Sequence, residues 1–256
     1  MKKKIGARIH PTAIIGKDVT LGKNITIGPN VIIYDNVTIG DHSVIGPHVI
    51  IGEPDKRFYE KANYKFSKTI IGPHAVIRSS TVIYTGCKIG SNFHTGHNAA
   101  IREKATIGNN CSIGTSAVID GNCILGDYVR MHYYSCICKK SRIGSFVWIY
   151  PYTILVDDLH PPCYKCCRGA IIDDYVVLGT QSIIFPGIKI GVHALIGPMS
   201  VVRKNVPPET VVYGSPAKNL GSIRDIKCVS GNRVKTPYPW PTHFSHGYPW
   251  EHKGWK

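Results

Sequence analysis

The sequence lacks long stretches of a single chemical character, and each absence excludes a class of protein. Its 256 residues carry a formal charge of +15 but no run of five or more Lys or Arg, so no segment is marked for nucleic-acid binding. No apolar stretch approaches the length of a membrane span. Arg8 and Lys17 interrupt the apolar core that a secretory signal would need after Lys2–Lys4. We therefore expect a cytoplasmic protein with neither a nucleic-acid partner nor a membrane partner.

The sequence also contains little methionine and lacks the spacing of apolar residues that is typical of helices. There are only three Met against 26 Gly and 17 Pro, and apolar residues do not recur at the three-and-four spacing of an amphipathic helix. The nine Cys are an odd number, which argues against a secreted disulfide framework and favours reduced thiols. Because 43% of the residues are apolar, a sizeable core can form. The composition favours an all-β protein of many short strands.

The strongest pattern present is an aliphatic residue that returns every six positions. It forms three runs, from Ile9 to Ile51, from Ile71 to Leu155 and from Ile172 to Val202, and only Thr95 departs from the apolar rule. Gly often follows the aliphatic residue, where a Cβ would crowd a turn. A small or β-branched residue often stands four places after it. Two inward positions per hexad fit a triangular coil of short parallel strands, with three hexads per coil.

This repeat assigns positions in space. Residues eighteen apart should stack above one another at roughly 4.8 Å, the spacing between strands. Residues 53–69 and 157–170 break the repeat and are predicted to leave the coil as loops, which on a rigid scaffold commonly carry binding chemistry. After about residue 213 the pattern ends. We expect a β-helix domain over 1–213 and, over 214–256, an irregular tail that begins with a coenzyme-side segment and continues as extended chain.

Two segments carry a family resemblance. The start at 9–16, and the stretch from Ile184-Phe185-Pro186-Gly187 to Gly214-Ser215-Pro216-Ala217-Lys218, resemble the hexapeptide-repeat acyltransferases over residues 9 to about 220. The resemblance implies the left-handed parallel β-helix of that class, a winding that the sequence pattern alone does not give. It also implies a homotrimer with active sites at the subunit interfaces.

A narrower resemblance concerns the substrate. Residues 90–103, with the pair His94-x-x-His97, look like the central coils of sugar-nucleotide N-acyltransferases, and together with 51–54 they resemble the UDP-N-acetylglucosamine acyltransferases. The implied activity moves an acetyl or other acyl group from acyl-CoA to the amino group of a sugar, with a nucleotide-linked amino sugar as the acceptor. The identity of the acceptor, the acyl chain, and the choice between N- and O-acylation stay open.

The resemblance also assigns roles within this segment. His97 matches the second His of the family's pair, and an imidazole with a pKa near 6.5 can act as general base at neutral pH. Thr115, one coil above, is the candidate whose backbone N–H stabilises the oxyanion. His94, Asn98 and Asn92 are the candidate substrate-binding residues.

Candidate residues for the co-substrate lie near the C-terminal end of the repeat. Arg203, Lys204 and Lys218 could complement the phosphates of acetyl-CoA. Pro216 and Ala217 belong to the segment that, in the resembling family, packs beside the coenzyme adenine.

No metal is expected, although one group of cysteines leaves a zinc site open. Cys163, Cys166 and Cys167 include a Cys-x-x-Cys, but a second such pair at the right separation is missing. Cys87, Cys111 and Cys123 fall at the small inward position and are most simply core residues.

Two other functions fit the same fold. A γ-type carbonic anhydrase needs a His pair five residues apart and a distant third His, whereas the pair here is three apart. A non-catalytic β-helix binding subunit would not be stabilised by acetyl-CoA, whereas a protein that binds it must be.

Overall fold

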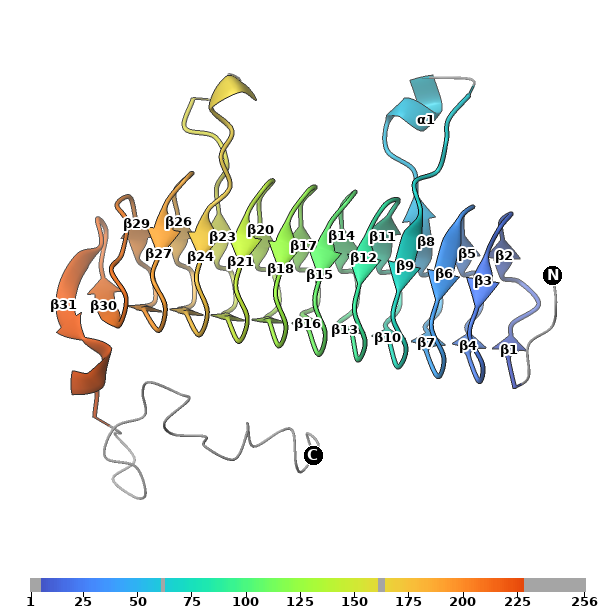
Figure 1. Ribbon diagram of the computed structural model, residues 1–256, viewed down its shortest axis with the longest axis horizontal. Coiled ribbons are helices and arrows are strands. Elements are labelled where there is room, and N and C mark those ends of the chain that lie inside the picture. The colour runs from blue at the N-terminus through green and yellow to red at the C-terminus, as the bar shows by residue number, and fades with distance from the viewer. Residues whose placement is uncertain (1–5, 61–62, 161–163, 228–256) are drawn as a thin grey trace.

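The chain winds into a long triangular prism (Figure 1). The structure is a computed structural model that describes residues 6–60, 63–160 and 164–227. Three sheets run along the prism, with twelve, ten and nine strands; we call them sheets A, B and C. All strand pairs in them are parallel except the last pair of sheet A. The predicted all-β parallel β-helix is confirmed.

As far as β29, each sheet takes every third strand, and β30 and β31 are then added to sheet A. Sheet A contains β1 (Arg8–Ile9), β4 (Thr26–Ile27), β7 (Val44–Ile45), β10 (Val76–Ile77), β13 (His94–Thr95), β16 (Ser112–Ile113), β19 (Arg130–Met131), β22 (Trp148–Ile149), β25 (Val177–Leu178), β28 (Leu195–Ile196), β30 (Thr210–Tyr213) and β31 (Lys218–Ser222). Sheet B contains β2 (Ile14–Ile15), β5 (Ile32–Ile33), β8 (Ile50–Glu53), β11 (Val82–Tyr84), β14 (Ala100–Ile101), β17 (Val118–Ile119), β20 (Cys136–Ile137), β23 (Ile154–Leu155), β26 (Ile183–Ile184) and β29 (Val201–Val202). Sheet C contains β3 (Thr20–Leu21), β6 (Val37–Ile39), β9 (Thr69–Ile71), β12 (Lys88–Ile89), β15 (Thr106–Ile107), β18 (Ile124–Leu125), β21 (Arg142–Ile143), β24 (Ile171–Ile172) and β27 (Lys189–Ile190).

The hexad sets both the register and the core. Partners such as Ile101 and Ile119 are eighteen residues apart, as three hexads per coil predict. The repeated aliphatic residues fill the interior, and all residues of the series from Ile27 to Val202, including Thr95, are at most 4% exposed. The small residue four places later also points inward, as at Ala99 and Ala117.

The turns explain why Gly follows the aliphatic residue. At Gly96 and Gly114 a Cβ would collide with the backbone nitrogens of Thr115 and Tyr133 in the next coil. Close approach of successive coils, rather than a positive φ, therefore requires Gly there. The left-handed turn conformation is taken two positions later by other residue types, for example Asn98 (φ 55°) and Ser116 (φ 55°).

The one polar residue in the aliphatic series is accommodated inside the prism. Thr95 is 3% exposed, and its Oγ1 accepts a hydrogen bond from the backbone N–H of Arg78 at 2.9 Å and lies 3.2 Å from Thr81 Oγ1. Two residues earlier, Phe93 occupies the inward position that is usually small and is fully buried. The large and small residues have exchanged places in this coil, so its volume is kept.

Both predicted loops leave the same edge of the prism, where strands of sheet B pass to sheet C (Figure 1). We call this edge the B–C corner; it includes the turns at 103–105 and 139–141. The first loop is shorter than the predicted 53–69, because Glu53 and Thr69 hold backbone hydrogen bonds to neighbouring coils. This loop, 54–68, contains helix α1 (Arg57–Glu60). The second, 157–170, contains a 3₁₀ turn, η1 (Tyr164–Cys166).

The chain is more regular after residue 213 than predicted. Strand β31 pairs antiparallel with β30, and the 3₁₀ turn η2 (Ile223–Asp225) follows. The 213/214 boundary stays a prediction, and the tail from 228 lies outside the described residues. Within the described residues, no helix has the length and apolarity to cross a membrane.

Candidate active site

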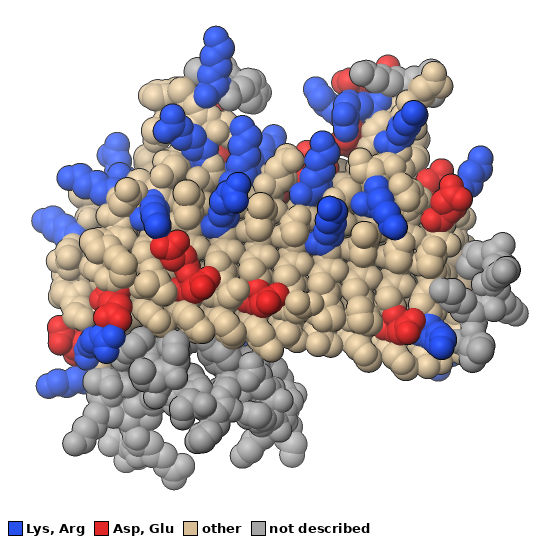
Figure 2. Space-filling view, in the orientation of Figure 1, with Lys and Arg blue, Asp and Glu red and all other residues tan. Residues whose placement is uncertain are grey.

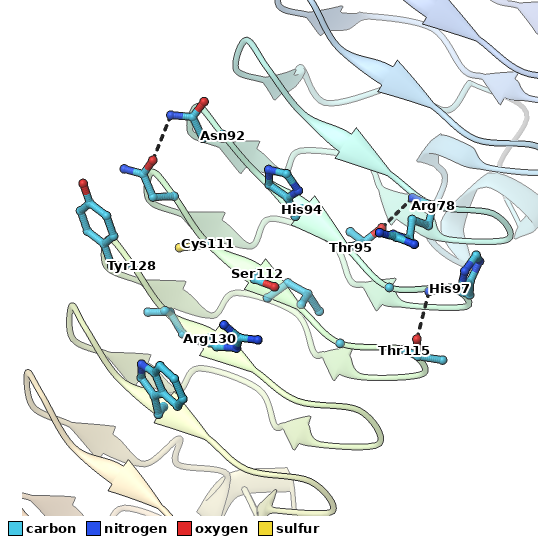
Figure 3. Close-up of a pocket in the computed structure, with 16 residues that line it drawn as sticks. Arg78, Asn92, His94, Thr95, His97, Cys111, Ser112, Thr115, Tyr128 and Arg130 are labelled. Carbon is cyan, nitrogen blue, oxygen red and sulfur yellow. Dashed lines mark hydrogen bonds between the residues drawn. The ribbon is translucent and has the colours of Figure 1, made fainter. Parts of the chain in front are cut away.

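The predicted catalytic segment lies on a groove of about 780 Å³ in the outer face of sheet A (Figure 3). Along this face the first residues of successive strands stack in the order Val76, His94, Ser112, Arg130 and Trp148. The face is hollow at Gly96, Ser112 and Gly114 because these residues carry little or no side chain. The groove is therefore a consequence of small residues in two adjacent coils.

His97 stands at the edge of this groove, in the turn at 96–99 where sheet A passes to sheet B. We call this edge the A–B corner. The ring is exposed, and its Nδ1 lies 2.6 Å from Ser79 Oγ, one coil below. If Nδ1 carries the proton and donates it to Ser79, Nε2 keeps a free lone pair. Ser79 can therefore orient the imidazole as a base.

Thr115 lies one coil above His97, as the eighteen-residue spacing predicts. Its Oγ1 accepts a hydrogen bond from the backbone N–H of His97 at 3.3 Å, and it lines the groove (Figure 3). No described residue accepts a hydrogen bond from the Thr115 N–H. This N–H is therefore available to a ligand, which an oxyanion donor requires.

His94 also lines the groove. Desolvation by its surroundings, and then the positive charge of Arg78, hold the pKa of His94 below its ordinary value. The ring is therefore expected to be neutral at pH values where an isolated His begins to take up a proton. A neutral ring suits a residue that accepts a hydrogen bond from a substrate hydroxyl or amine.

This cause can be tested by removing the charge of Arg78. In Arg78→Gln the pKa of His94 should rise, because the repulsion that disfavours the imidazolium is lost while the desolvation remains. Titration of the ring C–H signals by NMR measures the shift. Arg142→Gln removes a charge from sheet C and should leave the pKa of His94 where it is; equal shifts in the two variants would show that Arg78 is not the cause.

The two predicted asparagines are placed differently. Asn92 lines the groove on the edge opposite His97 and donates from Nδ2 to Asn110 Oδ1 at 2.9 Å. Asn98 is in the A–B corner next to His97 but does not line the groove. Of the pair, only Asn92 lines the groove together with His94 and His97.

The predicted coenzyme residues do not line the groove. Arg203 follows β29, with its guanidinium 5.1 Å from the Phe185 ring centre, and Lys204 beside it is exposed. Ala217 donates its backbone N–H to Val201 at 2.9 Å, with Pro216 before it and Lys218 after it. Counted by coils, this end lies about 25 Å from His97. An extended ligand would be needed to reach both.

Several groove residues were not predicted from the sequence: Arg78, Ser112, Arg130 and Trp148. Counting eighteen residues from His94 gives Ser112 and Arg130, and counting eighteen from His97 gives Ser79, so the signal was present. None of the residues that line the groove is Asp or Glu. The groove is therefore suited to an anionic ligand.

Next to Trp148, the His132 ring stacks on Tyr150 at 4.9 Å between centres. Burial, followed by the charge of Arg130, lowers the pKa of His132. No sequence signal pointed to this ring.

The cysteines behave as core residues where that was predicted. Cys87, Cys111 and Cys123 are buried, and burial raises the pKa of each thiol to about 12. Cys163 lies outside the described residues. In the described ranges, no three His, Cys, Asp or Glu side chains are grouped to hold a metal ion.

A known protein family matches part of the hexad repeat. Residues 18–53 match the family described as bacterial transferase hexapeptide (six repeats), and the eighteen-residue register extends the same repeat from Ile9 to Val202. Over residues 18–53 the chain is therefore similar to the hexapeptide-repeat family.

Relatives of this chain are named acetyltransferases. One from Schizosaccharomyces pombe is 36% identical over 90 residues, which are 32% of this chain and 44% of that protein. A 2,3,4,5-tetrahydropyridine-2,6-dicarboxylate N-acetyltransferase of Clostridium perfringens is 40% identical over 65 residues, 25% of this chain and 26% of that protein. The chain thus spans less than half the length of these relatives.

Among solved structures, the Arabidopsis UDP-N-acetylglucosamine acyltransferase is similar over 85% of this chain and 73% of that chain, with 19% identity and a TM-score of 0.47. Similarity at this level does not bear on the site.

Proposed function

We propose that this chain is a CoA-dependent acyltransferase that moves an acetyl or other acyl group from acyl-CoA to the amino group of a nucleotide-linked amino sugar. The observation that carries the proposal is His97 at the rim of an open groove, with one ring nitrogen oriented by Ser79 and Thr115 one coil above. The acetyltransferase names of its relatives support the reaction class.

In this proposal His97 Nε2 accepts the proton that the amine loses as its nitrogen attacks the thioester carbonyl. The Thr115 N–H donates to the carbonyl oxygen while that oxygen carries negative charge. The C–S bond then breaks, and the imidazolium returns its proton to the departing thiolate. Asn92 and His94, on the groove wall, contact the acceptor.

The charge of the groove supports a phosphorylated acceptor. Arg78 and Arg130 lie among its lining residues and no carboxylate does, so the phosphates of a nucleotide sugar meet cations alone. Arg203, Lys204 and the segment Pro216–Lys218 lie farther along the prism. In the proposal they contact the phosphates and adenine of an extended acetyl-CoA molecule.

The homotrimer is supported by the outer face of sheet B. The first residue of every strand in this sheet is apolar or Cys, and all ten are half-buried or exposed. These residues, which we call the sheet-B stripe, are Ile14, Ile32, Ile50, Val82, Ala100, Val118, Cys136, Ile154, Ile183 and Val201. The equivalent rows carry His94 and Arg130 on sheet A and Lys88 and Arg142 on sheet C. A continuous apolar face of this kind is suited to another copy in closed symmetry.

The proposal is tested by acetyl-CoA binding and acyl transfer together. Acetyl-CoA at one hundred times its Kd should stabilise the protein by about 2.7 kcal/mol, seen as a raised thermal midpoint. An amino sugar nucleotide should then release free CoA thiol, whereas the same nucleotide sugar with a hydroxyl in place of the amine should not. Absence of heat protection would favour the non-catalytic binding subunit. The described residues contain no group of three metal-ligating side chains, so they give no support to the carbonic anhydrase alternative.

A further inference from the structure

Four aromatic rings are stacked along the edge of the prism where sheet C passes to sheet A. We call this edge the C–A corner and the rings the ring column; they are Tyr128, Phe146, Tyr175 and His193, each at the same turn position in its coil, with φ between 57° and 61°. Neighbouring ring centres are 4.8 Å apart, and the ring planes differ by 2° to 18°. Each ring therefore lies flat against the next, and the column fixes the orientation of Tyr128 at its lower end.

Tyr128 ends the column at the groove. The same turn position holds Asn110 one coil below and Asn92 two coils below, and among the described residues the Tyr128 ring stacks only on Phe146. Because an Asn side chain is much shorter than a Tyr side chain, the outer part of the Tyr128 ring extends beyond Asn110. Tyr128 and both asparagines line the groove on the edge opposite His97 (Figure 3). One face of an aromatic ring is therefore available there to a ligand.

Asn110, below this ring, presents a hydrogen-bond donor. Asn92 Nδ2 donates to Asn110 Oδ1 at 2.9 Å, which fixes the Asn110 amide in one orientation. No hydrogen bond between described residues uses Asn110 Nδ2. This nitrogen can therefore donate to an acceptor that lies level with Asn110, under the overhanging part of Tyr128.

The charge along the two edges of sheet C indicates which part of a nucleotide suits this end of the groove. Figure 2 shows Lys and Arg gathered along the edge that bears the loops, with Asp and Glu on the opposite part of the same face. Beside the ring column, the turns of the C–A corner carry Asp127, Asp173 and Asp174. These carboxylates would repel a phosphate group. An uncharged planar group is therefore better suited to the C–A corner than the diphosphate of the same ligand.

A nucleobase has both of the properties that Tyr128 and Asn110 can bind. The π face of any base stacks on an aromatic side chain, and the edge of a base carries ring nitrogens or carbonyl oxygens that accept a hydrogen bond. The base would take the place, level with Asn110, that a further ring of the column would occupy.

The groove crosses sheet A, and its other end is where the amine reacts in the proposed function. Asn110 and Thr115 flank strand β16 and are five residues apart, which corresponds to at most about 16 Å of extended chain. Arg130, in the strand above, lies between the two edges. A nucleotide sugar carries its base and its sugar at opposite ends of a diphosphate. It can therefore place the base at Tyr128, the diphosphate near Arg130 and the amine at His97.

We propose that Tyr128 and Asn110 form a subsite for the nucleobase of the acceptor, with the base stacked under Tyr128 and hydrogen-bonded by Asn110 Nδ2. The inference rests on the proposed function and names the residues that recognise the nucleotide part of its acceptor. Acyl-CoA also carries a base, adenine. The subsite is assigned to the acceptor because it lies directly across the groove from His97 and Thr115, whereas the predicted coenzyme residues lie about 25 Å along the prism from His97.

Removing the ring tests the stacking. Tyr128→Ala should raise the KM of the acceptor about tenfold or more, because the base loses a contact that holds it in the ground state and the transition state alike. Tyr128→Phe keeps the ring and should keep the wild-type KM. The control Tyr175→Ala removes a ring from the same column outside the groove and should leave the KM of the acceptor unchanged. An unchanged acceptor KM in Tyr128→Ala, or an equal rise in Tyr175→Ala, would overturn the proposal.

Truncating the acceptor gives an independent test. For the wild type, an amino sugar diphosphate without the nucleoside should have a KM about tenfold or more above that of the complete nucleotide sugar. In Tyr128→Ala the two acceptors should differ little, because the base is no longer held. The same loss of discrimination is expected in Asn110→Asp, where a carboxylate oxygen replaces the donating N–H. If these variants discriminate as the wild type does, the base binds elsewhere, and this inference fails while the proposed function stands.

Binding without turnover separates the subsite from the proposed reaction. Uridine, thymidine and guanosine diphosphates can be titrated by calorimetry against the wild type, Tyr128→Ala and Tyr175→Ala. At least one should bind the wild type and Tyr175→Ala equally, and Tyr128→Ala about tenfold more weakly. If none binds the wild type, or if Tyr128→Ala binds them as the wild type does, the subsite is excluded.

Two further outcomes of this titration are informative. If CoA, rather than these nucleotides, binds Tyr128→Ala more weakly, the ring holds adenine and the assignment to the acceptor is wrong. If the nucleotides bind as expected but no amino sugar nucleotide is acylated, the proposed reaction fails and the base subsite stands.

Discussion

Replacing His97 with alanine should lower turnover by about 10²–10⁴-fold, the usual contribution of a general base. The ring is exposed at the A–B corner, and among the described residues its ring bonds only Ser79, so its removal leaves the core intact. The thermal midpoint should therefore stay close to that of the wild type. Steady-state kinetics with acyl-CoA and the acceptor measure the effect.

The matched control is His48→Ala, an exposed His in the same corner two coils below, which should keep full turnover. A His97→Ala protein with wild-type turnover would exclude His97 as the base. A loss well below a hundredfold would indicate that the departing CoA thiolate takes the proton and that His97 orients the acceptor.

Much of this site follows from the sequence because the β-helix converts spacing into position. The hexad places aliphatic residues inside, and the eighteen-residue stack is sufficient to place Thr115 over His97. The same rule could have found Ser79. It could also have found the row of His94, Ser112 and Arg130, because each is eighteen residues from the last.

The remaining features do not follow from local spacing. The groove exists because Gly96, Gly114 and Ser112 lack bulk beside larger neighbours, which is a property of several coils together. The length of each loop changes the number of residues between one hexad run and the next, but it does not determine the corner of the prism from which the loop leaves. The strand after residue 213 forms because β30 offers an unpaired edge, which the end of the hexad pattern concealed. Arg203 and Lys204 can contact a ligand bound at His97 only if that ligand spans several coils, and local spacing in the sequence does not reveal this.

The sequence shows that Thr95 replaces an aliphatic residue of the repeat, but it did not show that Phe93 offsets the lost volume. Among the side chains that the structure describes, Phe93 is the largest that is fully buried, and it takes an inward position held by Cys111 in the coil above. We expect the ring to make up for the volume that Thr95 lacks relative to an aliphatic residue, while the Thr95 hydroxyl accepts a hydrogen bond from the backbone of Arg78. The coil that holds His94 and His97 is therefore packed by Phe93.

Phe93→Ala should consequently lower the free energy of unfolding by about 3–5 kcal/mol, because it removes a buried ring from a close-packed interior and leaves a cavity. Denaturant unfolding followed by circular dichroism measures this loss. Cys111→Ala, at the equivalent buried position one coil above, removes a single sulfur atom and should cost about 1 kcal/mol. Phe93→Leu should fall between them, since it refills part of the cavity. If Phe93→Ala proves no less stable than Cys111→Ala, the ring does not pack this coil, and the exchange of large and small residues is not what lets Thr95 sit inside the prism.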